Sequence, residues 1–440
     1  MAPNSLPILP SPHIGSWLDA HAGPLMSWCV LVAAAAIAGH LVFRLSGFPR
    51  MLGYTVVGLL AGWLGFGDLP WPLQGNTQVL LQTAVGTSLL MAASQISLSW
   101  LLRQPWLLLQ SLAESVAALV LVTGVLQLLG MGWAVSLGVG VVAMAASPAV
   151  LLRVVADLRA SGAVTDRSLL LATLSGVYAL VLGLVITVAW SPAVAAGAGA
   201  EDALASLVLT ATGLGQLLLS LGLTVLWAVL TTVALWPVLR WQSSRSDSTA
   251  LYMLAALVAV SLLATRWGGS AALGFLVAGL LLRNMSPKPL VWPSAFMAAN
   301  TMLSLLMFVL VASMAGQVVP SVGLVSVIAA AALARLVGKM GGVLLLGLGT
   351  GLGWQRQWPV ACAQSPSSGL ALVLASALAM QWAVVNTGVA GALTAIALPM
   401  VVLCEVLGVL LASLALWRCG EAHRGIGLSA LNAKEKRHDA

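Results

Sequence analysis

The chain has 440 residues, of which 60% are hydrophobic and only 7% are charged, and its mean hydropathy is +1.03. A soluble protein carries roughly 25% charged residues, so the composition excludes a soluble fold and predicts an all-α polytopic membrane protein. The net charge of +7 comes from Lys and Arg in short loops rather than from a basic stripe, so we predict no nucleic-acid partner.

A membrane-spanning helix needs about 20 mostly apolar residues. Thirteen stretches are candidates: 25–43, 51–67, 77–98, 105–129, 133–156, 168–190, 205–236, 250–265, 270–284, 294–316, 321–349, 359–380 and 388–417. Two of them, 250–265 and 270–284, are short and would be tilted or half-buried. Residues 1–24 precede them and contain no Lys or Arg, unlike the basic start of a cleaved signal peptide. Residues 418–440 form a short charged tail, too small to be a folded domain.

The basic residues support an odd number of spans. With the N-terminus outside, sixteen of the 19 Lys and Arg residues fall in cytoplasmic loops or in the tail. Arg266 is in an outer loop, and Arg335 and Lys339 are inside a span. Because cytoplasmic loops are enriched in Lys and Arg, this distribution predicts an outer N-terminus and a cytoplasmic C-terminus.

Two spans carry a Ser-Pro pair, Ser147-Pro148 in the fifth and Ser365-Pro366 in the twelfth, about half a chain apart. Proline removes a backbone donor and clashes with the preceding turn, so each span is predicted to be a broken helix. Freed backbone groups survive in a membrane only where they face protein or a wet cavity. An odd interval separates the two spans, so they run in opposite directions. This indicates inverted repeats whose broken helices cross at mid-membrane around a transport site.

Four stretches carry a family likeness: Pro49–Gly62, Gly274–Leu281, Arg335–Lys339 and Ser365–Leu372. In this order and spacing the chain resembles the monovalent cation–proton antiporter superfamily, and most of all its Kef-type and bacterial sodium/proton exchanger branch. The resemblance covers roughly residues 25–417. It implies a secondary transporter of the bacterial inner membrane, working by alternating access and surrounded by lipid, that forms a homodimer.

The same resemblance implies a division of the chain into two groups of helices. Residues 25–104 and 250–316 would form a dimerisation panel, and residues 105–190 and 321–417 a core transport domain that slides against it. The long span 205–236 would link the two halves. Residues 1–24 would be an outer segment and residues 418–440 a cytoplasmic tail.

Family members bind the ion with an aspartate on the sixth span, which by counting would fall close to Val177. This chain reads Ser175-Gly176-Val177-Tyr178 there, with no carboxylate between Arg167 and Glu201. Serine hydroxyls and freed carbonyls can coordinate Na⁺ or K⁺, but they cannot carry a counter-proton. The sequence therefore predicts an atypical ion site.

Two carboxylates lie within spans, Glu114 in the fourth and Glu405 in the thirteenth. Intramembrane ionisable residues are costly and usually functional, so both are candidate proton carriers. The alternative for each is a structural role, as a partner for a cation or hydroxyl or as an anchor of helix packing. Arg335 and Lys339 are an i, i+4 pair and share one helix face, and we expect at least one of them to face the crossing. The other could instead extend toward the cytoplasmic interface.

Neutral hydrogen-bonding groups accompany these charges, although small polar residues can equally serve close helix packing. The predicted substrate and ion-binding set is Ser147, Pro148, Ser175, Val177, Tyr178, Arg335, Lys339, Gln364, Ser365, Ser367 and Ser368. No nucleophile–base or metal-ligand constellation is recognisable, so we predict no enzyme activity, no cofactor and no metal centre.

Three functions fit this pattern. The first is antiport of a monovalent cation, Na⁺ or K⁺, against H⁺. The second is transport of a small anion or organic acid on the same scaffold, because the crossing would hold net positive charge and half-helix N-termini attract anions. The third is a membrane sensor or scaffold that has lost its ion site. A salt bridge from Arg335 or Lys339 to Glu114 would favour the first.

Overall fold

The computed structural model describes residues 24–66, 73, 75–189, 211–241, 247–286, 290–318, 321–347, 349, 351–367 and 369–423. Several predicted features lie outside this part of the chain. They are the N-terminal segment up to residue 23, the stretch 190–210, Ser368 and the tail from residue 424.

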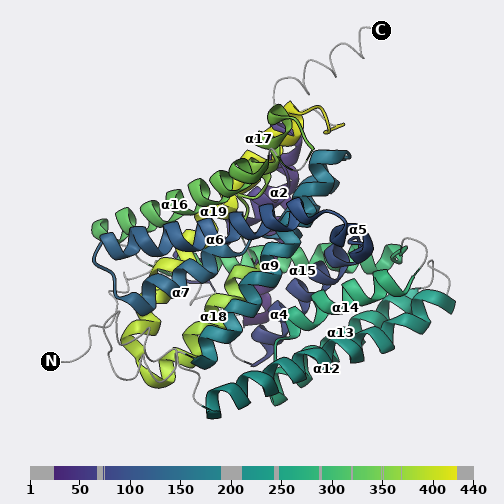
Figure 1. The fold of residues 1–440 in the computed structure, drawn as a ribbon, viewed down its shortest axis with the longest axis horizontal. Coiled ribbons are helices and arrows are strands. Elements are labelled where there is room, and N and C mark those ends of the chain that lie inside the picture. Colours follow the sequence, from purple (N-terminus) through teal and green to yellow (C-terminus); the bar gives the residue numbers. More distant parts are fainter. Residues whose placement is uncertain are drawn as a thin grey trace, which may run out of the picture.

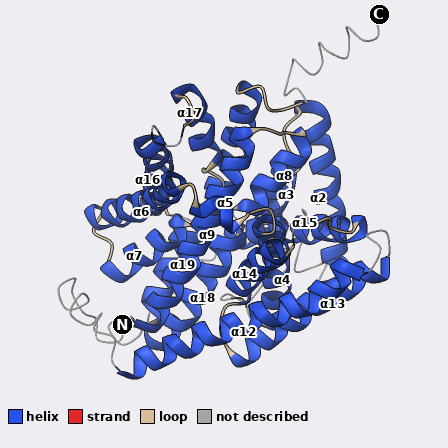
Figure 2. Ribbon diagram, turned by 45° about the vertical axis from the view of Figure 1, so that its right-hand side comes forward, coloured by secondary structure: helices blue, strands red, loops and turns tan. Residues whose placement is uncertain are grey.

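The described residues form helices joined by short connections, with no strand among them (Figure 2). In chain order the helices are α2 (Pro24–Ser46), α3 (Met51–Trp63), α4 (Gly75–Ala93), α5 (Leu98–Leu102), α6 (Pro105–Leu128), α7 (Trp133–Met144), α8 (Pro148–Leu158), α9 (Ala163–Ala189), α12 (Ala211–Trp241), α13 (Asp247–Trp267), α14 (Ala271–Met285), α15 (Ser294–Gly316), α16 (Val322–Gly347), α17 (Trp354–Ala363), α18 (Gly369–Val385) and α19 (Thr387–Arg418).

Each of the thirteen predicted spans corresponds to one helix or to a pair of half-helices. Nine described stretches, counting α7 and α8 together, are long and apolar enough to cross a membrane, and α3, α14 and α18 are shorter apolar helices. Helix α4 accounts for the remaining span. The five-residue helix α5 was not predicted, and it fills the connection between the third and fourth spans.

Both predicted helix breaks are present. Helix α7 ends at Met144 and α8 begins at Pro148, while α17 ends at Ala363 and α18 begins at Gly369. Ser147 is extended, and its hydroxyl accepts a hydrogen bond from the Val150 N–H, so it caps α8 with proline at the first helical position. The Ser147 N–H donates to the Pro366 carbonyl at 3.1 Å. The two breaks therefore meet, as predicted.

The helices pack as two groups. Helices α6, α7, α8, α9, α16, α17, α18 and α19 contact one another, and we call them the core group. Helices α2, α3, α4, α12, α13, α14 and α15 form the panel group. Figure 1 shows α6 and α16 side by side along one edge of the molecule and α12, α13 and α14 along the opposite edge. The seam between the groups is formed by α3, α4, α12, α14 and α15 on one side and α8, α9, α18 and α19 on the other.

The segment that follows α19 returns to the start of α9. The Glu421 carboxylate accepts hydrogen bonds from the backbone N–H groups of Val164 and Thr165, each at 2.8 Å, and from the Thr165 hydroxyl at 2.8 Å. The first N–H groups of a helix lack partners inside the helix. Glu421 therefore caps α9 from the far end of the chain.

Candidate functional site

Arg335 lies at the crossing of the two broken helices. It is completely buried on α16, and its guanidinium donates to four backbone carbonyls. Two of these, Ala143 at 3.0 Å and Ala145 at 2.9 Å, belong to the end of α7. The other two, Ser365 and Pro366, follow the end of α17. Because a helix C-terminus is electrically negative, the cation neutralises the ends of both first half-helices.

Lys339 lies one helical turn from Arg335 and forms an ion pair with Glu114 of α6, with Nζ 3.1 Å from Oε2. Both side chains are completely buried. Glu114 Oε1 is also within 3.5 Å of the Ser115 hydroxyl. Two buried opposite charges stabilise the fold only while they remain together, since removing one leaves the other unpaired. The sequence singled out both residues, and the fold brings them into contact.

Two glycines of α16 bring this ion pair together. A side chain at Gly342 would collide with the Glu114 backbone, and one at Gly338 would lie 2.7 Å from Ala118 Cα. The two glycines are four residues apart and share one face, so α16 and α6 approach closely along it. Lys339 and Glu114 therefore face each other across the closest part of this helix pair.

On α9 the residue that meets the crossing is Ser175. Its hydroxyl accepts a hydrogen bond from the Ala146 N–H at 3.1 Å, immediately before α8. Val177, where counting placed the family's aspartate, is partly buried and packs against the hydrophobic core instead. Tyr178 is half-buried beside Ser111 and Glu114. On α9 a neutral hydroxyl, and no carboxylate, therefore meets the residues just before α8.

The second break supplies further oxygen atoms. The Gln364 amide donates to the Ser168 carbonyl at 2.9 Å, while its own Oε1 has no partner among the described residues. The hydroxyl groups of Ser168, Ser365 and Ser367 are likewise buried and without a hydrogen-bond partner in the described structure. Buried polar groups are normally satisfied, so these unpartnered oxygens are candidates to bind water or an ion.

Glu405 lies apart from this cluster, at the seam. Its Oε1 is 2.8 Å from the Thr55 hydroxyl of α3, and the same hydroxyl is 3.0 Å from the Met51 carbonyl. A hydroxyl has one proton, so if Thr55 donates to Met51 the carboxyl group must donate to Thr55. No basic side chain pairs with Glu405 within the described ranges. The arrangement fits a neutral, protonated Glu405.

The structure adds residues that the sequence analysis did not select. Ser111 is one turn from Glu114 on the same face of α6, and Ser168 is two turns from Ser175 on α9. Helical spacing from the selected residues could have found both. Thr55 could not be found this way, because it reaches Glu405 from a helix 350 residues away in the chain.

Two interrupted, oppositely running helices that cross beside buried charges define a secondary transporter. The family model described as sodium/hydrogen exchanger, transmembrane, matches residues 30–417. The chain belongs to this family, and it is an integral membrane protein.

Solved structures share the fold. The sodium proton antiporter MjNhaP1 from Methanocaldococcus jannaschii at pH 8 aligns with a TM-score of 0.60 and 15% sequence identity, over 90% of this chain and 99% of that chain. A second structure of MjNhaP1, from electron microscopy, aligns with a TM-score of 0.54 and 16% identity, over 94% and 96% of the two chains. No curated protein sequence matches this chain.

Proposed function

We propose that this protein exchanges a monovalent cation, Na⁺ or K⁺, for a proton. The observation that carries the proposal is the buried ion pair between Glu114 and Lys339, one turn from Arg335 at the helix crossing. Family membership supports the proposal at the level of cation–proton exchange. The choice of cation and the assignment of the site to these residues belong to the proposal.

The ion pair offers one site to two competitors. A cation that binds the Glu114 carboxylate must displace the Lys339 ammonium group. Hard cations prefer oxygen ligands, and the unpartnered oxygens of Gln364, Ser365 and Ser367 at the second break are candidate neutral ligands. The displaced ammonium would be buried without a partner, which is costly, so Lys339 releases its proton.

The reverse steps complete the exchange. A proton that returns to Lys339 restores the ammonium group, which reclaims Glu114 and expels the cation. One positive charge leaves for each that enters, so the charge of the site stays constant. Cation and proton therefore alternate, and exchange of one for one is expected to be electrically neutral.

Arg335 has a different task in this scheme. Its guanidinium donates to carbonyls at the ends of both first half-helices. It therefore stabilises the two helix breaks and does not exchange a proton. An anion carrier would need a buried cation that is not already engaged. Lys339 is paired with Glu114 and Arg335 with four carbonyls, so the arrangement favours the cation.

The test is proton efflux from reconstituted vesicles when Na⁺ or K⁺ is added to the outside. We expect saturable flux that does not change when the membrane potential is clamped. Glu114→Gln and Lys339→Gln should each lower it at least 100-fold. Glu405→Gln is the matched control, because its carboxylate lies outside the ion pair, and it should retain exchange. Absence of flux from the unmodified protein across a wide pH range would overturn the proposal and favour a sensor or scaffold.

The remaining expectations accompany this proposal. Sliding of the core group against the panel group, a homodimer formed through the panel, and an outer N-terminus in a bacterial inner membrane follow from the sequence analysis. Crosslinking between single cysteines on panel helices tests the dimer, and protease access to the tail in oriented vesicles tests the orientation.

A further inference from the structure

We propose that a cavity at the seam is the entry site for a partly hydrated monovalent cation, and that Arg153 with Asp157 forms a latch closing the opposite half of the seam. The inference rests on the proposed function, because it requires that the core group and the panel group move relative to each other.

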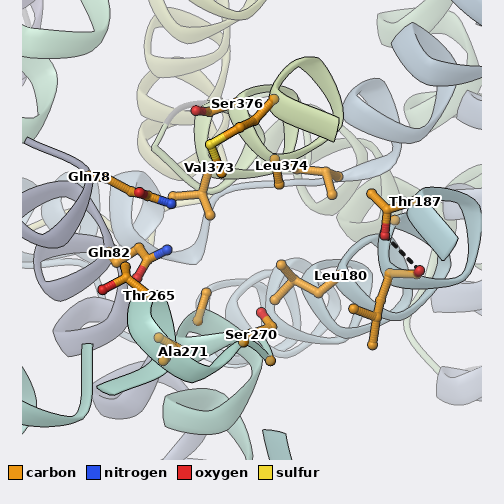
Figure 3. Close-up of a pocket in the computed structure, with 18 of the residues that line it drawn as sticks. Gln78, Gln82, Leu180, Thr187, Thr265, Ser270, Ala271, Val373, Leu374 and Ser376 are labelled. Atoms are coloured by element: carbon orange, nitrogen blue, oxygen red, sulfur yellow. Dashed lines mark hydrogen bonds between the residues drawn. The ribbon is translucent and has the colours of Figure 1, made fainter. Parts of the chain in front are cut away.

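The cavity has a volume of about 280 Å³ and lies between core helices α9 and α18 and panel helices α4, α13 and α14. That volume holds several waters, each of which needs roughly 30 Å³. Its polar lining consists of amides and hydroxyls: Gln78, Gln82, Thr187, Ser220, Thr265, Ser270, Ser376 and Gln381. Figure 3 shows Gln78 and Gln82 on one side, Thr187 on the other and Leu180 between them.

The lining suits passage of a cation rather than permanent binding. No charged side chain lines the cavity, so amide and hydroxyl oxygens can replace part of a hydration shell without trapping the ion. Gln82 Oε1 is buried and has no hydrogen-bond partner among the described residues. The Gln82 Oε1 atom can therefore accept a hydrogen bond or coordinate a cation.

The cavity ends shortly before the helix crossing. Along α9, Leu180 is five residues beyond Ser175, and along α18, Val373 is four residues beyond Gly369. At a rise of 1.5 Å per residue, the inner end is about 6–8 Å from the crossing along both helices. Leu374 packs against Gly183 and Leu370 against Gly176, so apolar side chains separate the cavity from the ion pair.

The opposite half of the seam is closed by side chains of α8. Arg153 donates to the Thr301 hydroxyl at 2.7 Å and to the Ser304 hydroxyl at 3.3 Å, both on α15. Asp157, one turn later, accepts from the Arg50 N–H at the start of α3 at 3.0 Å. At the cavity end, the Leu73 N–H donates a hydrogen bond across the seam to the Ser376 hydroxyl at 3.2 Å.

Chain order assigns these ends to opposite membrane faces. The cavity is lined by the connection Gly268–Ser270 and by residues near the ends of α9 and α18, whereas the latch lies near the connection between α2 and α3. The distribution of Lys and Arg predicts the cavity face outside and the latch face inside. In this orientation the cavity lies on the outer side of the crossing, and the contacts of Arg153 and Asp157 close the inner side.

Accessibility to a membrane-impermeant cationic thiol reagent tests the latch without measuring flux. Single cysteines are placed at Gln78 in the cavity and at Ser304 in the latch, after the four native cysteines have been replaced by alanine. We expect Gln78→Cys to react from the cavity face and Ser304→Cys to be protected from both faces. Adding Arg153→Ala should open the latch side, so Gln78→Cys should react severalfold more slowly from the cavity face and Ser304→Cys should become reactive from the latch face.

Two further variants guard against misfolding. Arg159→Gln changes an exposed arginine at the same end of α8 and should leave both reactivities unchanged. Arg153→Lys keeps a donor for Thr301 and should give intermediate reactivities. Equal reactivity with and without Arg153, or a reactive Ser304→Cys in the presence of Arg153, would overturn the latch.

Cation protection tests the entry site. Na⁺ or K⁺, compared with choline at equal ionic strength, should slow modification of Gln78→Cys, and adding Gln82→Leu should weaken this protection severalfold. No cation effect would overturn the entry site. Neither cysteine-labelling measurement depends on Glu114. A failure of the expected labelling changes would therefore count against the latch or the entry site. Absence of cation–proton exchange would count only against the proposed function.

Discussion

The Arg335 side chain supplies hydrogen-bond donors to carbonyl groups that would accept from backbone N–H groups in an unbroken helix. A broken helix exposes carbonyl groups that hydrocarbon cannot satisfy. The planar fork of an arginine can reach both breaks at once, as its four hydrogen bonds show. A lysine at this position would present a single point charge and could not span both ends with the same geometry.

Arg335→Ala should therefore destabilise the protein by about 3–5 kcal/mol, because buried carbonyls lose a charged donor. Arg335→Lys should fall between the alanine variant and the unmodified protein. Thermal unfolding in detergent, followed by intrinsic fluorescence, measures both. Arg266→Ala, at an exposed helix end, is the control and should unfold normally. Equal unfolding temperatures for Arg335→Ala and the control would contradict this role.

The same isosteric change should destabilise the protein to different extents at the two buried carboxylates. Glu114→Gln leaves the Lys339 ammonium group without its counter-ion and should cost about 3 kcal/mol. Glu405→Gln replaces a neutral group by a neutral group that still reaches Thr55, so its cost should stay below about 1 kcal/mol. Chemical denaturation of the two purified variants compares them. A larger loss for Glu405→Gln would mean that Glu405 is charged.

At the scale of the helix, the pairing of α6 with α16 depends on glycine. Gly342→Ala should separate the two helices, weaken the Glu114–Lys339 pair and lower both unfolding temperature and exchange rate, because the added methyl group meets the Glu114 backbone. Gly341→Ala is a matched control one residue away, with open space around the new carbon. Alanine is the better helix former by about 0.8–1 kcal/mol, so the control should be slightly stabilised. Equal behaviour of the two variants would refute the close approach.

Much of the candidate site was predictable from the sequence because helical periodicity is local. Ser-Pro pairs mark the breaks, and i, i+4 spacing places Arg335 and Lys339 on one face. The division of labour between these two residues was not predictable. It depends on which neighbouring helix supplies a carboxylate and which supplies carbonyls, and this is decided by packing between distant segments. The same reason explains why Ser175, rather than the position of Val177, meets the crossing.

At the scale of the whole molecule, all thirteen spans were predictable from apolar length alone. Apolar length does not show where the seam opens. The seam depends on which helices pack against each other, and the sequence does not specify the neighbours of each helix. The cap that Glu421 gives to α9 was also unpredictable. It joins residues more than 250 positions apart through a carboxylate in a short polar segment.

Glu421→Ala should leave the first N–H groups of α9 without an acceptor and cost about 1–2 kcal/mol, the usual range for a lost helix cap. Hydrogen exchange at residues 163–166 should become faster in this variant. A variant truncated after His423 retains the Glu421 carboxylate, so hydrogen exchange at residues 163–166 should be as slow as in the full chain. If exchange at these residues is unchanged in Glu421→Ala, the carboxylate is not the cap.

This long-range cap also sets an order for assembly during translation. Helix α9 leaves the ribosome long before Glu421 does. The first N–H groups of α9 therefore lack this acceptor until α19 has been synthesised and inserted. A nascent chain arrested at Arg418 would already contain every described helix and would still lack this final closure.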